Sequence, residues 1–284
     1  EILKTVLIPL WNAYTFFVTY ANIDNIQPKG APESPDNPLD RWILSEAEGL
    51  VGDVSEHLEN YDIQKAIVPI LGFIDNLNNW YIRRSRRRFW RSENDTDKEQ
   101  AYASLYSVLM RIIMVAAPFM PFVTEEIFQN LRTEDMAESI HLCDYPIYQS
   151  DKRDPDLERK MRATQQAVSM GRALRSMHNL KIRQPLKAIH LVTRDPEERK
   201  ILLEMEDIIK EELNVKEVIF RENEEDLVEF QAKPNYRILG KQLGKKMKSA
   251  ARKIEARSTS EIQSLLDGSV LHIEIDEQTH ELTK

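Results

Sequence analysis

Cysteine is almost absent from this sequence, and its single example, Cys143, excludes an internal disulfide and any zinc site built from several cysteines. A reducing compartment suits such a chain, so we expect a cytoplasmic protein. No apolar run approaches the roughly 18 residues of a membrane helix, and we expect no membrane contact. The N-terminus has neither an initiator methionine nor a signal-peptide pattern, which favours a fragment of a longer protein.

The motifs of common enzyme sites are also missing. The sequence contains no Gly-x-Ser-x-Gly elbow and no dinucleotide fingerprint. Segment 240–246 is not a phosphate-binding loop, because three residues separate its glycines and Lys246 stands where Ser or Thr is needed. The six histidines lack metal-ligand spacing. We therefore predict no catalytic residue, no metal ligand and no cofactor in this chain.

Arginine is concentrated in one place, although the chain of 284 residues carries a net charge of −8. Six arginines fall within nine residues, at the end of a segment whose apolar residues recur every three or four positions from Ile63 to Tyr81. This pattern predicts an amphipathic helix that ends in positive charge. Repulsion between these arginines costs roughly 1–3 kcal/mol at low salt, so we expect an anion beside them.

Phosphate is one candidate for that anion, because guanidinium groups match its geometry and the interleaved aromatic residues can stack on bases. Carboxylates of this chain or of a partner are the alternative. A solvated face is less consistent with the pattern, since such faces carry mixed charges. The predicted RNA contacts in this cluster are Trp80, Arg83, Arg84, Arg86, Arg87, Arg88, Trp90 and Arg91.

Helical periodicity dominates the first two thirds of the chain. Apolar spacing predicts helices at 10–22, 39–58, 63–91, 102–116, 121–131 and 157–177, with a proline-rich linker at 25–38. Shorter β-branched runs at 188–193, 217–220, 227–232 and 270–275 alternate with helices at about 196–213 and 239–257. The fold class is therefore mainly α: a helical bundle followed by a small α+β domain.

Two further basic sets accompany these later elements. The first surrounds the end of the helix at 157–177 and comprises Arg172, Arg175, Lys181 and Arg183. The second lies opposite an apolar stripe in the helix at 239–257 and comprises Lys241, Lys245, Lys248 and Arg252. For the second set, a phosphate-facing surface and a solvated lysine-rich face are equally open.

Several segments, in the same order, resemble the C-terminal part of isoleucyl-tRNA synthetases, a class I aminoacyl-tRNA synthetase family, in its eukaryotic-like form. The segments are Ile8–Tyr14, Tyr20–Asp24, Pro38–Ser45, Asn79–Trp90, Asn179–Leu186, Glu212–Lys216 and Lys233–Lys241. The resemblance implies a segment leaving a catalytic core at 1–24, a linker at 25–38, a helical anticodon-binding domain at 39–145, a connector at 146–156 and an α+β domain at 157–284.

The resemblance also implies a function. The parent would join isoleucine to its tRNA with ATP and magnesium, and this part would hold the anticodon stem-loop. Both class I adenylate signatures, His-x-Gly-His and Lys-Met-Ser-Lys-Ser, are absent, so the fragment itself is expected to be inactive. Its expected partners are isoleucine tRNA and the missing catalytic core, and we expect a monomer. A valyl- or leucyl-tRNA synthetase region and a protein-interaction module are the alternatives.

Overall fold

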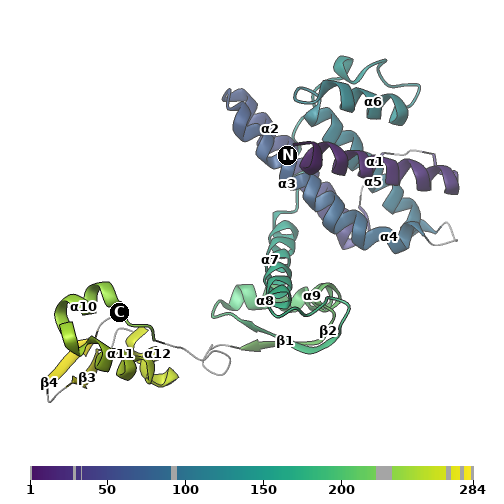
Figure 1. Ribbon diagram of the computed structural model, residues 1–284. Coiled ribbons are helices and arrows are strands. Elements are labelled where there is room, and N and C mark those ends of the chain that lie inside the picture. Colours follow the sequence, from purple (N-terminus) through teal and green to yellow (C-terminus); the bar gives the residue numbers. More distant parts are fainter. Residues whose placement is uncertain are drawn as a thin grey trace. The chain divides into compact units, whose positions relative to one another are not determined.

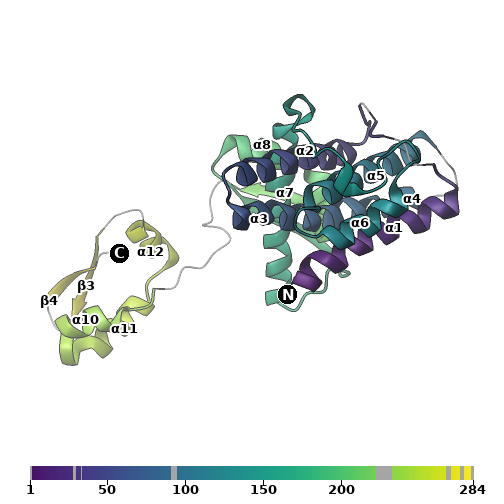
Figure 2. The same ribbon diagram turned by 90° about the horizontal axis from the view of Figure 1, so that it is seen from above.

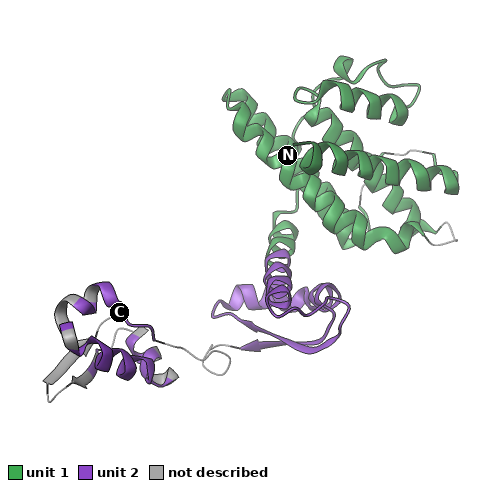
Figure 3. Ribbon diagram, viewed as in Figure 1, with its two compact units in different colours: residues 1–163 green, residues 164–284 purple. Residues whose placement is uncertain are grey.

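The computed structural model describes residues 2–27, 30–32, 34–90, 95–221, 232–266, 270–275 and 278–282. The chain divides into two compact units, residues 1–163 and residues 164–284 (Figure 3). The boundary falls inside helix α7, Pro155–Met177, which begins in the first unit and ends in the second (Figure 1). The predicted fold class, mainly helical with a small α+β part, is confirmed.

The first unit is a bundle of helices. Its elements are the π-helical segment η1 (Leu3–Leu7), α1 (Ile8–Asp24), α2 (Pro38–Glu59), α3 (Ile63–Asp75), the π-helical segment η2 (Asn76–Ile82), α4 (Arg83–Phe89), α5 (Thr96–Ala116) and α6 (Pro121–Leu131). Helix α2 packs against both α3 and α5, and the three helices lie side by side in both views (Figures 1 and 2). Apolar residues of this bundle, such as Ile43, Leu77 and Leu105, are fully buried.

Local sequence signals place the ends of these helices. The Asn37 side chain caps α2 by accepting a hydrogen bond from the backbone N–H of Leu39 at 2.9 Å, and Pro38 occupies the first turn. Asp95 caps α5 in the same way, accepting from the backbone N–H of Lys98 at 2.8 Å. The helices predicted at 10–22, 39–58, 102–116 and 121–131 are all present, with α5 beginning six residues earlier than expected.

The predicted helix at 63–91 is present to residue 89 as a continuous run of α3, η2 and α4. The π-helical stretch in its middle was not expected from the sequence. A π-helical insertion rotates the residues that follow it relative to those that precede it, and such insertions often accompany functional sites. The arginines of α4 therefore point in a different direction from the one that the apolar spacing of α3 would predict.

Two short 3-10 turns, η3 (Ile140–Leu142) and η4 (Ser150–Lys152), lie in the connection from α6 to α7. In the second unit, β1 (Leu186–Val192) and β2 (Val215–Arg221) form a parallel pair, and Leu186 lies opposite Val215. Helices α8 (Pro196–Glu204) and α9 (Glu206–Leu213) connect these strands, where a single helix was predicted. Met205 separates the two helices.

The rest of the second unit comprises α10 (Tyr236–Leu243), the 3-10 turn η5 (Gly244–Lys246), α11 (Met247–Glu255), α12 (Thr259–Leu266), β3 (Leu271–Ile275) and β4 (Gln278–Leu282). Strands β3 and β4 pair antiparallel. The single helix predicted at 239–257 is interrupted at Gly244, whose φ of +49° favours glycine. Helix α12 and strand β4 were not predicted, and the strand predicted at 227–232 lies almost entirely outside the described residues.

Candidate nucleic-acid interface

One face of α4 carries a stripe of positive charge that ends in an aromatic ring. Arg83, Arg86, Arg87 and Trp90 follow at helical spacing, and we call these four residues the arginine face. Arg86 and Arg87 are exposed, and 56% of the Trp90 surface is open to solvent. The Arg83 guanidinium lies 5.9 Å from the centre of the Trp80 ring, and its Nε donates to the Asn79 carbonyl oxygen at 2.7 Å. The helix therefore presents its arginines in a defined row.

Arg86 and Arg87 have no acidic partner among the residues that the structure describes. Within the part of the chain that the structure describes, neither makes an ion pair or a side-chain hydrogen bond. Carboxylates of the described residues therefore do not neutralise Arg86 and Arg87, so the internal-carboxylate alternative does not apply to these two residues within that part of the chain. Adjacent, exposed and uncompensated guanidinium groups raise the local positive potential, which attracts anions even though the whole chain is acidic.

Arg88 faces the opposite way, into the bundle. Its guanidinium donates to both carboxylate oxygens of Asp40 on α2, at 2.8 and 2.7 Å, and to Asp97 on α5 at 3.0 Å. Burial by itself lowers the pKa of Arg88, but the hydrogen bonds with Asp40 and Asp97 outweigh it and raise the pKa above its ordinary value. Only 7% of the residue is exposed, so the predicted RNA contact is corrected to an internal ion pair.

A second buried ion pair fixes α1 against α5. Lys98 is fully buried, and its Nζ lies 2.7 Å from the Asp24 carboxylate, which also accepts a hydrogen bond from the Tyr102 hydroxyl. Burial raises the pKa of Asp24, but the hydrogen bonds from Lys98 and Tyr102 lower it by more, so the net pKa lies below its ordinary value. The end of α1 is thereby held against α5.

Two aromatic residues of α1, Phe16 and Tyr20, lie beside the rings at the end of the arginine face. The Tyr20 and Trp90 rings lie 6.4 Å apart between centroids, while Phe16 meets Phe89 edge-on at 5.2 Å. Sequence reasoning missed Tyr20 and Phe16. Their spacing of four residues on a predicted helix was the available signal, but it lies beside the stronger apolar spacing that predicted this helix. Trp80, predicted as a stacking surface, is only 7% exposed, so Trp90 is the accessible ring of the pair.

The first basic set of the second unit is divided between internal and external roles. Arg175 is 6% exposed and donates to the carbonyl oxygens of Lys181 and Gln184, each at 3.0 Å, and of Leu213 at 2.7 Å. Its guanidinium therefore organises the chain after α7 instead of facing RNA as predicted. Arg172 pairs with Glu212 yet keeps 44% of its side chain exposed, and Lys181 and Arg183 are exposed.

The second basic set of that unit is only partly described. Lys248 and Arg252 are exposed on α11, whose opposite side buries Met247, Ala250 and Ile254. This matches the predicted amphipathic arrangement. The side chains of Lys241 and Lys245, and the whole of Arg91, lie outside the described residues.

Comparison with known proteins shows the family of the domain that carries this surface. Residues 40–190 match the anticodon-binding domain of tRNA ligases, which is more than half of the chain. The chain belongs to this family. The anticodon-binding domain match contains the arginine face and the first basic set of the second unit, and it ends before Lys248 and Arg252.

Individual relatives of this anticodon-binding chain carry the name isoleucine–tRNA ligase. The protein of Treponema denticola is 56% identical over 296 residues, which cover 100% of this chain and 27% of the relative. Those of Protochlamydia amoebophila and Chlamydia muridarum are 47% and 41% identical, over 94% and 100% of this chain and 26% and 27% of the relatives. The chain thus spans about a quarter of the length of these curated relatives.

No group of three or more His, Cys, Asp and Glu side chains among the described residues is placed to hold a metal ion. None of the helices in the described ranges has the length and hydrophobicity needed to cross a membrane.

Proposed function

We propose that this chain is the tRNA-binding C-terminal part of an isoleucine–tRNA ligase, and that its arginine face holds the anticodon stem-loop of isoleucine tRNA. The observation that carries the proposal is the exposure of Arg86 and Arg87 without an acidic partner among the described residues, beside the open ring of Trp90. The family match and the names of the relatives support tRNA as the partner of this surface.

The chemistry of each group suits one part of a stem-loop. Arg83, Arg86 and Arg87 offer planar guanidinium forks to the phosphates, which position the RNA but do not read its sequence. Trp90, with Tyr20 beside it, offers a ring on which an unpaired base can stack. Single-stranded anticodon bases favour stacking and edge hydrogen bonds over groove readout.

The remaining predicted residues have different roles. Half-buried Arg84 is a further RNA contact beside the arginine face. Arg172, Lys181 and Arg183 form a second contact set, and the exposed Lys248 and Arg252 a third. Arg88 and Arg175, whose guanidinium groups are buried in internal bonds, act as positioning residues.

The parent protein would join isoleucine to its tRNA with ATP and magnesium in the cytoplasm, as a monomer. The catalytic groups belong to the other three quarters of the relatives' length. This chain's residues would contribute affinity and orientation, so that the far end of the tRNA reaches the catalytic core.

The test is a binding series across salt concentrations with three ligands: isoleucine tRNA, the same tRNA with an altered anticodon, and an unrelated tRNA. We expect selective binding that falls several-fold when the anticodon changes, with a log–log salt slope of magnitude about 3 or more. The R86A/R87A variant should reduce that slope by about 2, because two phosphate contacts are removed.

A charge-matched control separates contact from net charge. Lys65 and Arg159 are exposed and each makes only a surface ion pair, so the K65A/R159A variant removes the same charge from the same unit. It should leave the slope within about 0.5 of the unmodified chain. Equal, weak binding of all three tRNAs would overturn the proposal and give the arginine face a role against another part of the parent protein.

A further inference from the structure

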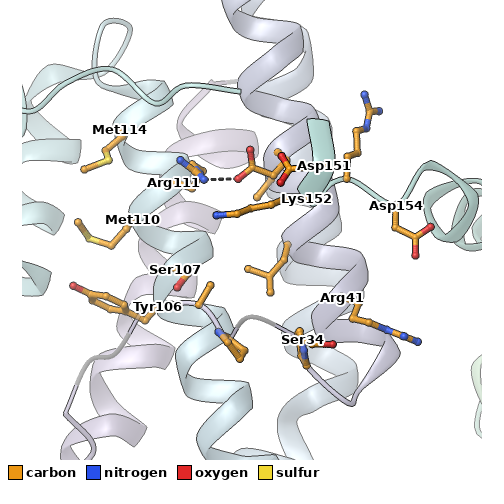
Figure 4. Close-up of a pocket in the computed structure, with 18 of the residues that line it drawn as sticks. Ser34, Arg41, Tyr106, Ser107, Met110, Arg111, Met114, Asp151, Lys152 and Asp154 are labelled. Carbon is orange, nitrogen blue, oxygen red and sulfur yellow. Dashed lines mark hydrogen bonds and ion pairs between the residues drawn. The ribbon is translucent and has the colours of Figure 1, made fainter. Parts of the chain in front are cut away.

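A cavity of about 840 Å³ lies in the first unit, along the groove between α2 and α5 (Figure 4). Its remaining walls come from the linker, from Met136 and from residues 151–154, and the linker residues are Gly30, Ala31, Pro32, Ser34 and Pro35. Its size falls within the range of roughly 300–1,000 Å³ that is typical of small-molecule sites. None of the residues so far assigned to RNA contacts lines it.

One side of the cavity is formed by apolar and flexible side chains. Tyr106, Met110 and Met114 follow one another along one side of α5 in Figure 4, and Met136 lines the same cavity. Tyr106 is fixed, because its hydroxyl donates to the Leu131 carbonyl oxygen at 3.1 Å. Thioether side chains adapt to the outline of a bound group and make favourable contacts with aromatic rings, worth about 0.3–1.5 kcal/mol each. This side is therefore suited to a flat heterocycle.

The other side of the cavity is polar and held in place. Arg111 forms an ion pair with Glu48, which also accepts from the backbone N–H of Gln149 at 3.2 Å. Ser107 lies one turn from Arg111 on the same helix, and Lys152 points inward over the groove (Figure 4). Donors and acceptors thus line the cavity beside the apolar residues of α5 (Figure 4).

The charges of the lining favour a neutral ligand over a phosphate. Arg111 is neutralised by Glu48, and Arg153 by Glu158 at 2.9 Å. The other charged residues of the wall are balanced, two cations against two anions: Arg41, Lys152, Asp151 and Asp154. A nucleobase presents this combination of a flat apolar face and an edge of donors and acceptors.

The first turn of α2 links the cavity to α4. Arg41 lines the cavity, and the residue before it, Asp40, holds Arg88 of α4 through two hydrogen bonds. The first turn of α2 therefore contacts α4 and borders the cavity.

We propose that the cavity between α2 and α5 receives one unstacked base of single-stranded RNA, with its face against Met110, Met114 and Met136 and its edge toward Ser107 and Lys152. This inference rests on the proposed function and deepens it, because it adds a base-recognition site to a surface that otherwise contacts phosphates and a single ring.

The methionines provide the readout. We would label the methionine methyl groups of the whole chain with ¹³C and follow them by NMR while adding a seven-nucleotide single-stranded RNA that carries the isoleucine anticodon loop sequence. The signals of Met110, Met114 and Met136 should shift. Met161, which is buried in the same unit and does not line the cavity, serves as the reference and should not move.

Two variants extend the test to affinity. S107L fills part of the cavity and K152A removes the inward-pointing amine, and each should weaken RNA binding about fivefold or more, with the salt slope nearly unchanged in S107L. Adenosine at millimolar concentration should shift the same methyl signals, and inorganic phosphate should not. K152A keeps the test valid if S107L fails to fold.

The outcomes separate this inference from the proposed function. RNA binding that R86A/R87A weakens, but that leaves the three methionine signals and the K152A affinity unchanged, overturns the cavity site alone. A shift caused by phosphate alone overturns its assignment to a base. No binding of RNA or of adenosine overturns the cavity site together with the proposed function.

Discussion

Arg88 on α4 and Asp40 on α2 face each other as a two-pronged ion pair, with nitrogen–oxygen distances of 2.8 and 2.7 Å. Successive residues of a helix point about 100° apart, so turning Arg88 inward turns Arg86 and Arg87 toward solvent. The Tyr81 hydroxyl adds a hydrogen bond to the same carboxylate at 2.7 Å. One buried acid on a neighbouring helix thereby sets the direction in which the exposed arginines point.

Removing that acid should destabilise the first unit severely. The D40A variant leaves Arg88 buried beside Asp97 alone, and we expect the free energy of unfolding to fall by about 3–5 kcal/mol in urea titrations at neutral pH. The control is R87A, which removes an exposed arginine that makes no ion pair among the described residues, and it should change the free energy of unfolding by no more than about 0.5 kcal/mol. Similar values for the two variants would contradict an orienting role for Asp40.

The rings of Trp90 and Tyr20 should contribute to RNA affinity independently of the charges. W90A is expected to weaken binding of the anticodon stem-loop by about 1–3 kcal/mol, and Y20A by less, because a base stacks mainly on the more exposed ring. The salt slope should stay the same in both variants. Y20F, which keeps the ring, is the control and should bind like the unmodified chain. Equal loss in Y20F and Y20A would assign the effect to the hydroxyl.

Acid should weaken the contact between α1 and α5. The pKa of Asp24 in the folded protein lies below its ordinary value of 3.8, so its ion pair with Lys98 is fully present above that pH. As the pH falls below 3.8, the unfolded chain takes up the proton first, and the contribution to stability is lost. The stability difference between D24N and the unmodified chain, measured by urea titration, should therefore shrink in this range. A constant difference would contradict the assignment.

Two glycines offer a matched pair of substitutions. A Cβ at Gly171 on α7 would stand 2.6 Å from a methyl group of Leu213, which is buried and cannot swing away, so G171A should cost about 1–3 kcal/mol. A Cβ at Gly72 on α3 would meet nothing within 4 Å, so G72A should add about 0.5–1 kcal/mol. Thermal unfolding of both variants measures this contrast. Stabilisation by G171A would contradict the packing of α7 on α9.

Local patterns determined most of the helical architecture. Apolar spacing placed α1, α2, α5 and α6, and capping or proline residues such as Asn37 and Pro121 marked where helices begin, because these signals act within one or two turns of the chain. The clustering of arginines around Trp90 likewise indicated an anionic partner, and this stays a prediction for the arginine face. The later elements were harder. Gly244 interrupted a helix and Met205 divided another, since the α+β part depends on pairing between distant strands.

Only the tertiary structure decided which arginines face outward. From the sequence, Arg86, Arg87 and Arg88 are equivalent members of one run, and nothing in their spacing identifies Asp40, 48 residues away, as the partner of the third. The same holds for Arg175, whose acceptors lie as far along the chain as Leu213. The charge pattern can be read from neighbouring residues of the sequence, and it predicts that an anion lies beside the arginines. Burial and pairing depend on residues that only folding brings together, and they determine which arginines remain exposed to bind that anion.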